Sequence, residues 1–470
     1  MLCVCKPSQV LGEPFLDGSV CVECDEDGDD IDVVRPGILD VDTDGVQPEP
    51  NYNVESITDA AELLVGAESA TTTVAEEREL LLLECAMHIK TARAQRALYQ
   101  EKIDKAIGDA KAGMAHSKRT YTFVVDYGQN MELPVYNTQQ PGCTYYYSPL
   151  SIYNLGMVDH AHSYANGTVA AHMYAHVYHE GVGKKGANNV ASLIVKTLRH
   201  LNLLLDNSVG GELNIVFDNC SGQNKNNTVL KLAGWLKAMG YFKTVNFIFL
   251  IVGHTKNAAD RLFNSLKVEY RKKNLYTMDM LTDALCRSDG VTVIPTMPED
   301  FYNYDALFKH LYRNLTRNVK QNHIFSCSES DRMDLRESNV NEHKSRSHKL
   351  SKKGRLMTTE ELKAYSSTAL ENVECAGLNP YKMVELWKNY RPHVPEQYRR
   401  DRLFRKPDAK VMSLVKDEKS ERSVLRAKLK KAKTAGMKER LQSIAYLDDE
   451  GNDAPIVQEG DDDDEEENET

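Results

Sequence analysis

The stretch LNIVFDNCSGQNKNNTVLKLAGWLKAMGYFKTVNFIFLIV, residues 213–252, decides the fold class of this chain. Its first five residues, Leu213–Phe217, form a short and mainly apolar run that is typical of a buried strand. Thr228–Met239 has the apolar spacing of a helix, and Val245–Val252 is a second apolar strand. Two buried strands joined by a helix predict a parallel pair with helices over both faces. We therefore expect an α/β core.

The elements around this stretch complete the sheet. Asn166-Gly167 is a strong two-residue hairpin signal, and it joins two β-rich runs. The full order predicted is strand, hairpin, helix, strand, helix, strand, helix. Outside the opening stretch, the first strand is Tyr121–Val125, the hairpin strands are Ser151–Tyr164 and Thr168–His179, and the helices are Ala187–Leu204 and Ala258–Lys272. This order predicts a mixed five-stranded sheet flanked by helices, in which the hairpin supplies the antiparallel part.

Composition divides the chain into five expected segments. They are a mostly disordered acidic segment (1–72), the core domain with a preceding helix and a following extension (73–330), a basic linker (331–357), a basic helical C-terminal region (358–445) and a disordered acidic tail (446–470). The preceding helix is long, about Glu76 to Lys111, and no proline interrupts it. Its apolar stripe is expected to pack on or near the core, and consists of Leu80, Leu83, Met87, Ala94 and Leu98.

The formal net charge of −11 conceals a division of charge along the chain. Both ends are strongly acidic, whereas the residues between them are basic on balance. Lys and Arg on a surface displace counterions from phosphates, so a basic body favours a polyanionic partner. We expect that partner to be nucleic acid, and DNA in particular.

The sequence also predicts where the protein resides. No apolar run approaches the ~20 residues that a membrane-spanning helix needs, and no signal peptide opens the chain. Ten cysteines, mostly scattered singly, fit a reducing compartment better than a disulfide framework. We therefore expect an intracellular, nuclear protein without a membrane partner.

Polar residues follow three of the predicted strands. Asp126 follows Phe123-Val124-Val125, Asp218 follows Phe217, and His254 follows the strand that ends at Gly253. Asp260 lies in the first turn of the next helix. Because ligands bind beyond the carboxyl ends of strands in such sheets, Asp126 and Asp218 approach each other if their strands are neighbours. Converging carboxylates favour Mg²⁺ or Mn²⁺, and a pair of ions suits phosphodiester cleavage.

Each of these residues also has a purely structural interpretation. Asp218-Asn219 is a good turn pair, and Asp260 at the third helical position favours the helix dipole. His254, at the entrance of a loop, can form hydrogen bonds with nearby groups of that loop. The three acids together, at the required ends of the required elements, favour an active site.

At this point the chain resembles a known superfamily. The element order, together with Asp126-Tyr127-Gly128-Gln129-Asn130, Asp218-Asn219-Cys220-Ser221-Gly222-Gln223-Asn224 and Gly253-His254-Thr255 with Asp260-Arg261, is similar to RNase H-like enzymes of the DDE/D transposase kind. In particular it resembles a transposon-associated eukaryotic family of unknown function. The resemblance covers roughly residues 75–400.

The resemblance implies roles for these residues. Asp126 and Asp218 would bind both metals, Asp260 would be the third acid, and His254 would orient water or a phosphate. Gln223, Asn224 and Asn219 would support the acids or contact a backbone phosphate. Ribonucleases H place a glutamate in the helix after the third strand, but Ala187–Leu204 has none; Glu180 is the nearest candidate. A three-acid transposase arrangement is therefore favoured.

Two kinds of alternative stay open. Cys3, Cys5, Cys21 and Cys24 could bind zinc, although the first pair is tightly spaced and zinc is not the expected cofactor. His160, His162, His172 and His176 form a four-histidine zinc site only if the hairpin register slips, because a simple two-residue turn places the two pairs on opposite faces. In function, the alternative to a nuclease or polynucleotidyl transferase is an inactive, domesticated transposase relative that binds nucleic acid or protein.

Overall fold

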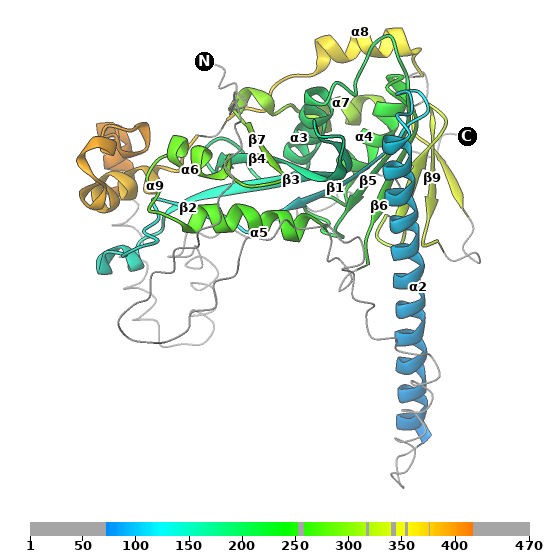
Figure 1. Cartoon of the computed structure of the whole chain (residues 1–470), viewed down its shortest axis with the longest axis horizontal. Helices are drawn as coiled ribbons and strands as arrows, with labels where there is room; N and C mark the ends of the chain where they lie inside the picture. The colour runs from blue at the N-terminus through cyan, green and yellow to red at the C-terminus, as the bar shows by residue number, and fades with distance from the viewer. Residues whose placement is uncertain are drawn as a thin grey trace, which may run out of the picture. The chain divides into compact units, whose positions relative to one another are not determined.

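A computed structural model describes residues 72–251, 258–315, 319–339, 345–352, 356–375 and 377–416. It is a mixed α/β fold in which helices cover one large mixed sheet (Figure 1). The helices are α2 (Thr72–Lys111), α3 (Ala187–His200), α4 (Asn227–Ala238), α5 (Ala258–Arg271), α6 (Met278–Leu285), α7 (Tyr304–Leu311), α8 (Thr359–Ala369) and α9 (Pro380–Glu385). No helix in the described ranges is both long and apolar enough to cross a membrane.

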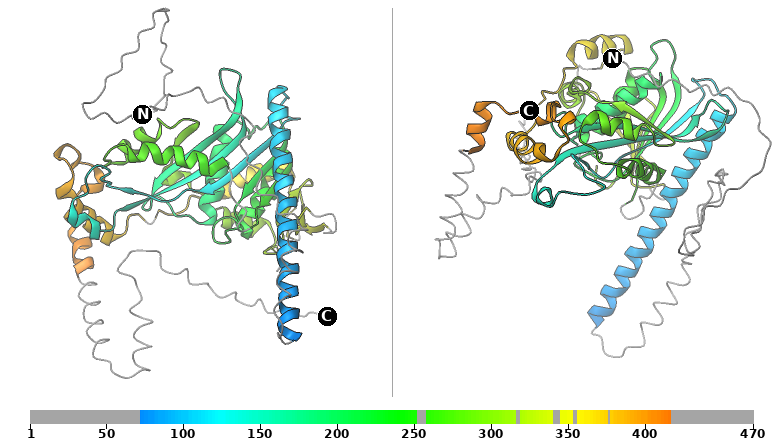
Figure 2. Two further views of the ribbon diagram at one scale, coloured as in Figure 1. Left: turned by 60° about the horizontal axis from the view of Figure 1, so that its bottom comes forward. Right: turned by 60° about the vertical axis from the view of Figure 1, so that its left-hand side comes forward.

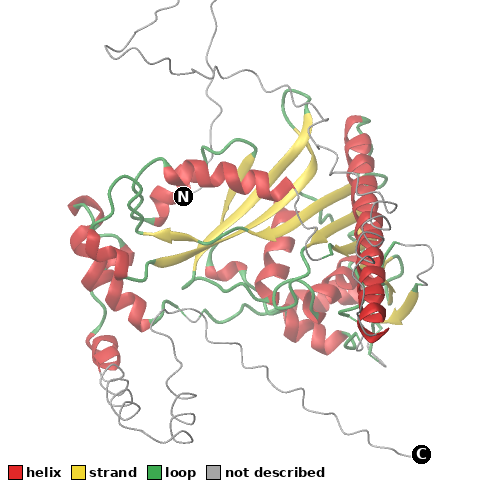
Figure 3. Ribbon diagram, turned by 90° about the horizontal axis from the view of Figure 1, so that it is seen from below, coloured by secondary structure: helices red, strands yellow, loops and turns green. Residues whose placement is uncertain are grey.

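The sheet has ten strands, seen from below in Figure 3. They are β1 (Thr120–Tyr127), β2 (Met131–Leu133), β3 (Leu150–Ser163), β4 (Val169–His179), β5 (Gly210–Phe217), β6 (Phe242–Phe249), β7 (Val291–Pro295), β8 (Ile324–Cys327), β9 (Arg332–Arg336) and β10 (Arg346–Lys349). The order across the sheet is β10-β9-β8-β6-β5-β1-β3-β4-β7, and β2 pairs with β3.

The five predicted strands form the middle of this sheet. β1 pairs antiparallel with β3, and β3 pairs antiparallel with β4. On its other side β1 pairs parallel with β5, and β5 pairs parallel with β6. The carboxyl ends of β1, β5 and β6 therefore lie at one edge, which is where a ligand site is expected.

The prediction of five strands is wrong in number. β7 extends the sheet beyond β4, and β8, β9 and β10 extend it beyond β6. These additions have only four or five residues each. β9 and β10 are also rich in charged residues, as strands at a sheet edge usually are, so they carry little of the apolar alternation from which strands are predicted.

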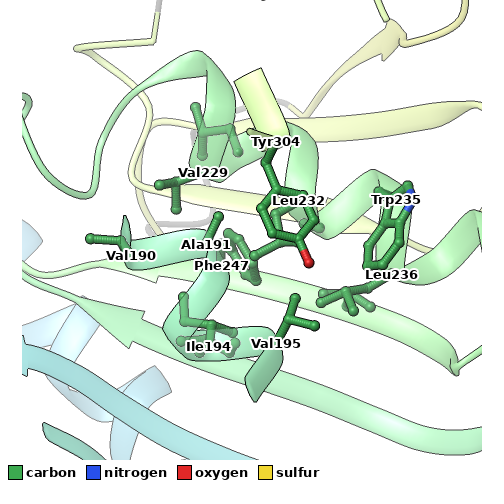
Figure 4. Close-up of a cluster of buried hydrophobic side chains, with 14 of the residues drawn as sticks. Val190, Ala191, Ile194, Val195, Val229, Leu232, Trp235, Leu236, Phe247 and Tyr304 are labelled. Atoms are coloured by element: carbon green, nitrogen blue, oxygen red, sulfur yellow. The ribbon is translucent and has the colours of Figure 1, made fainter. Parts of the chain in front are cut away.

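Two apolar cores lie on the two faces of the sheet. The first unites Val125 and Phe217 with residues of α3, α4 and α7, and Figure 4 shows part of it around Trp235 and Tyr304. The second unites Val124 and Val216 with residues of α2, α5 and α6. Adjacent residues of β1 and β5 thus alternate between the cores, as the pleat of a strand requires.

Helix α2 contacts the sheet through its C-terminal half, where Leu98 of the predicted stripe packs against the second core. Its buried residues are Ala92, Gln95, Tyr99, Ile103 and Ala106. Ion pairs support this contact, since Lys102 and Lys105 each lie 2.8 Å from Glu212 at the start of β5. Leu80, Leu83 and Met87 are exposed instead. The first three residues of the predicted stripe therefore do not pack on the core, and a polar residue, Gln95, takes part in the buried face.

Candidate active site

Asp126 is the penultimate residue of β1 and lies opposite Gly156 of β3. On the other side, Val125 is the parallel partner of Phe217. Asp126 and Asp218 therefore occupy the next step of the same register, at the carboxyl ends of two neighbouring strands. Side chains two positions apart in a strand lie on the same face, so Asp126 and Asp218 lie on the face of Val124 and Val216. These two valines belong to the core that α5 covers.

Asp218 is held by the loop that follows it. The side-chain amide of Asn224 donates a hydrogen bond to Asp218 Oδ1, and the backbone N–H of Cys220 lies 3.4 Å from the same oxygen. The loop folds back on itself because the N–H groups of Asn224 and Lys225 both donate to the Cys220 carbonyl at 2.9 Å. Asn226 then caps α4 by accepting from the Val229 N–H. This local turn positions Asn224 against Asp218.

Asp260 lies in the first turn of α5 and is exposed. One turn further along, Phe263 packs against the two glycines beside Asp126. A Cβ at Gly156 would lie 2.8 Å from the Phe263 ring, and a Cβ at Gly128 would lie 2.9 Å from it. Only glycine lets the ring approach so closely. Phe263 thus holds the start of α5 over the end of β1 and the middle of β3.

The electrostatics connect the three acids. Burial raises the pKa of Asp126 to about 7, and the negative charge of Asp218 contributes next to this rise. A backbone hydrogen bond from Tyr127 lowers the pKa, the charge of Asp260 raises it, and the charge of Lys185 lowers it. The carboxylates of Asp218 and Asp260 are therefore close enough for Asp126 to sense both charges, and such clustering of acids is favoured by a cation.

Lys185 is a site residue that the sequence did not predict. It lies between β4 and α3, with its ammonium 5.0 Å from the ring centre of Tyr127 and 5.2 Å from that of Tyr153. Tyr178 supports the loop, because its hydroxyl donates to the Lys184 carbonyl at 2.8 Å and lies 2.9 Å from the Tyr127 hydroxyl. The signal in the sequence was the Gly183-Lys184-Lys185-Gly186 turn, which directly precedes the predicted helix Ala187–Leu204.

Two buried amide oxygens also lie near the acids. Asn224 Oδ1 and Asn154 Oδ1 are buried and have no hydrogen-bond partner in the described parts of the chain. Asn154 lies two residues before Gly156 on β3, and its carbonyl accepts from the Gly128 N–H at 2.8 Å. Buried amide oxygens are normally hydrogen-bonded, so each of the two is suited to accept a hydrogen bond from ordered water or to contact a cation.

The donor chemistry fits Mg²⁺ or Mn²⁺, with one restriction. Among the described residues, no group of three or more His, Cys, Asp or Glu side chains is arranged to hold a metal ion. Asp126 and Asp218 supply two neighbouring carboxylates, whose oxygens are hard donors. Mg²⁺ is commonly bound in proteins through one or two carboxylates, with water and substrate phosphate completing its shell. The pair therefore suits an ion that is shared with a substrate.

Of the remaining predicted residues, some lie near the acids, one has structural contacts, and others lie outside the described parts of the chain. Asn219 and Gln223 lie half-buried in the loop between β5 and α4. Glu180 has structural contacts: its Oε1 accepts from the Ser151 N–H at 3.0 Å and lies 3.7 Å from Lys382 Nζ. His254 lies outside the described residues, as do the cysteine candidates, which are Cys3, Cys5, Cys21 and Cys24.

The predicted register of the histidine hairpin is wrong. A β-bulge between Asp159 and His162 changes the pairing, so that His172 lies opposite Asp159 and His162 opposite Ala170. His162 consequently stacks on His172, with ring centres 4.4 Å apart. His160 is on the other face, 2.8 Å from the Tyr99 hydroxyl. The extra residue of the bulge cannot be read from the turn sequence alone.

Part of this chain is similar to a family model. Residues 148–349 match a domain of unknown function (DUF7869). The match begins just before β3 and ends with β10, so it includes Asp218 and Asp260 but not Asp126. No curated protein and no solved structure matches the chain.

Proposed function

We propose that this protein is a metal-dependent nuclease or polynucleotidyl transferase of the transposase type, acting on nucleic-acid phosphodiesters. The observation that carries the proposal is the placement of Asp126 and Asp218 at adjacent carboxyl ends of β1 and β5, with the charge of Asp260 sensed by Asp126. Acids that repel one another in a half-buried site are stabilised by divalent cations, which phosphodiester chemistry uses.

The arrangement of the central strands supports an RNase H-like fold. β4, β3 and β1 are antiparallel neighbours, and β1, β5 and β6 are parallel neighbours. In chain order, Asp126 lies at the end of the first of these five strands and Asp218 directly after the fourth, and Asp260 lies in the first turn of the helix after the fifth. This is the arrangement that the sequence resemblance implies. β2 and β7–β10 are additions to it.

The chain's own groups have distinct tasks in such a reaction. Asp126 and Asp218 bind the cation, and Asn224 orients Asp218 through its amide N–H. Lys185 offers a positive charge beside Asp126 that suits a substrate phosphate. A bound divalent ion would lower the pKa of an attacking water or hydroxyl and stabilise the leaving oxygen. Asp126 must lose its proton before it can bind the cation, so activity should increase as the pH rises through the pKa of Asp126.

The test is cleavage of labelled DNA and RNA in Mg²⁺ or Mn²⁺ by the wild type and by Asp218→Asn. We expect cleavage by the wild type only. Asp279→Asn is a matched control for Asp260→Asn, because both aspartates lie in the first turn of a helix. Loss of activity in Asp260→Asn but not in Asp279→Asn separates metal binding from a helix-dipole effect. Equal cleavage by the wild type and Asp218→Asn contradicts the proposal.

We propose DNA as the substrate and the nucleus as the location, on the basis of the basic composition between the acidic ends. Competition between DNA and RNA in the cleavage assay tests the substrate. Imaging of the tagged full chain tests the location.

One observation favours a second candidate, an inactive relative that binds nucleic acid or protein. The described residues do not bring three metal ligands together. This candidate predicts salt-dependent DNA binding without cleavage, and no calorimetric signal for Mn²⁺. The nuclease proposal predicts a Mn²⁺ signal that Asp126→Asn and Asp218→Asn each abolish.

A further inference from the structure

Two neighbouring tyrosines are exposed just before β3. Tyr145 and Tyr146 end the short helix η1 (Gly142–Tyr146), and their exposed fractions are 75% and 85%. Their rings are nearly perpendicular, with centres 5.5 Å apart. No other tyrosine, phenylalanine or tryptophan in the described ranges is exposed to this degree. A packed aromatic side chain buries about 150–250 Å², so a pair of rings left in water is well suited to contact a ligand.

The segment that carries the tyrosine pair is attached to the C-terminal unit (residues 377–416), which includes α9. The Sγ atom of Cys143 lies 3.1 Å from Nε2 of His393. The Tyr390 hydroxyl donates to the Tyr147 carbonyl at 2.9 Å, and the ring centres of these two residues are 5.7 Å apart. Figure 2 shows the two segments, coloured cyan and orange, side by side. Contacts before and after the tyrosine pair therefore hold it beside the C-terminal unit.

The C-terminal unit is strongly basic. It has ten lysines and arginines against four aspartates and glutamates. Arg391 lies between the two residues that contact the tyrosine segment, and its guanidinium forms no ion pair with any other described residue. The same holds for four exposed cations of the unit, which are Lys388, Arg400, Arg402 and Arg405. Cations that lack an acidic partner in the described parts of the chain favour a polyanionic ligand.

We propose that the tyrosine pair and the adjoining cations bind single-stranded DNA. This proposal rests on the proposed function for its partner, nucleic acid, and adds where the partner binds and in which form. Aromatic rings stack on bases, and they need unpaired bases because both faces of a base are covered inside a duplex. Lysines and arginines beside the rings contact the phosphates. Tyr145 and Tyr146 thus each stack on a base, and Arg391 contacts a phosphate.

A strand bound there can also reach the acids. β1 and β3 are antiparallel, so the carboxyl end of β1 points toward the end of the sheet at which β3 begins. Asp126 lies opposite Gly156, which is six residues after Leu150, the first residue of β3. At about 3.3 Å per residue, this separation is ~20 Å. A strand of about six nucleotides at ~3.4 Å each spans the same distance. The tyrosine pair would therefore hold a strand whose scissile phosphate lies at the acids.

The test is fluorescence anisotropy of labelled oligothymidine with the full chain in EDTA, which prevents metal-dependent cleavage. Tyr145→Ala and Tyr146→Ala should each weaken binding about five- to tenfold, whereas Tyr145→Phe and Tyr146→Phe keep the ring and should bind like the wild type. A strand of the same length without bases should bind the wild type and the alanine variants equally. Leu205→Ala is the control, because it removes an exposed side chain (39%) in the loop before β5, and it should bind like the wild type. Circular dichroism verifies that each variant is folded.

Salt dependence tests the phosphate contact. Arg391→Gln should reduce the slope of log affinity against log salt by roughly 0.7, because one phosphate contact of a single strand is lost. The same reduction should appear with the strand that has no bases. Lys309→Gln is the matched control and should keep the wild-type slope, since Lys309 is a cation of α7 that is paired with Asp305 at 3.0 Å.

Alanine variants that bind the single strand as tightly as the wild type overturn the proposal. A wild type that binds duplex DNA as tightly as the single strand overturns it as well, and tighter binding of RNA overturns the choice of DNA. These outcomes are separate from those of the cleavage test, because binding is measured without metal. A chain that binds the single strand through its tyrosines but does not cleave it contradicts the nuclease proposal alone.

Discussion

Asp126 and Asp218 lie one step beyond the paired residues Val125 and Phe217, on two parallel strands and on the same face of the sheet. Two distant segments of the chain thus bring two carboxylates to adjacent positions. The consequence is electrostatic: burial and the charge of Asp218 together hold the pKa of Asp126 near 7. Repulsion between two such carboxylates destabilises the folded protein unless a cation or a proton neutralises one of the charges.

The first prediction concerns pH. Asp126 ionises near pH 4 when unfolded and near pH 7 when folded, so the stabilisation from its proton is present below pH 4 and is lost as pH rises to about 7. The variant Asp126→Asn has no proton to lose at this position, so its stability does not decrease for this reason as the pH rises. We expect the unfolding free energy of the variant, relative to wild type, to increase by roughly 2–4 kcal/mol between pH 4 and pH 7.5.

Denaturant unfolding at several pH values measures this difference. Asp218→Asn provides the comparison, because removing the neighbouring charge should lower the pKa of Asp126 and move the transition to lower pH. A difference between Asp126→Asn and wild type that is constant with pH would refute the assignment.

The second prediction concerns divalent ions. Mg²⁺ or Mn²⁺ should raise the melting temperature more at pH 8 than at pH 5.5, since protons compete for Asp126 at the lower pH. The ion-dependent increase should disappear in Asp126→Asn and Asp218→Asn and persist in Asp279→Asn. Thermal unfolding with and without EDTA gives the readout, and an equal increase in all variants would indicate unspecific binding.

The third prediction concerns the glycine beside Asp126. A Cβ at Gly156 would lie 2.5 Å from Met173 Sδ and 2.8 Å from the Phe263 ring, so Gly156→Ala should destabilise the protein by about 1–3 kcal/mol. Phe263→Leu in the same chain should recover part of the loss. Gly142→Ala is the control, because nothing lies within 4 Å of its Cβ position. Equal stability of the two alanine variants would contradict this packing.

The fourth prediction separates structure from catalysis. Glu180 accepts from the Ser151 N–H and lies near Lys382, whose ammonium also donates to the Pro149 carbonyl at 2.7 Å. Glu180→Gln should therefore lower stability by about 1 kcal/mol and leave metal-dependent cleavage unchanged. Unfolding and cleavage assays on the same preparation decide the point. Loss of cleavage at unchanged stability would instead make Glu180 a fourth acid.

Part of the site was predictable and part was not. Asp126 and Asp218 could be predicted from the sequence because each follows an apolar run, and ligands bind beyond the carboxyl ends of such strands. Lys185 was not singled out, since a lysine in a glycine-flanked turn looks like ordinary surface. Asn154 was hidden for another reason: it lies inside a strand, and only the neighbouring Gly128 and Gly156 reveal that its surroundings are close to the acids.

The sequence by itself determined the middle of the sheet and its helices, because the alternation of apolar runs with helical spacing is a local property of the chain. Tertiary structure alone decided the rest. The pairing of β1 with β5, the bulge that moves His162 onto His172, and the pairing of the five added strands with the sheet depend on contacts between distant residues. The exposed stripe of α2 has the same origin: periodicity shows that Leu80, Leu83 and Met87 share a side, but only packing decides which side meets the sheet.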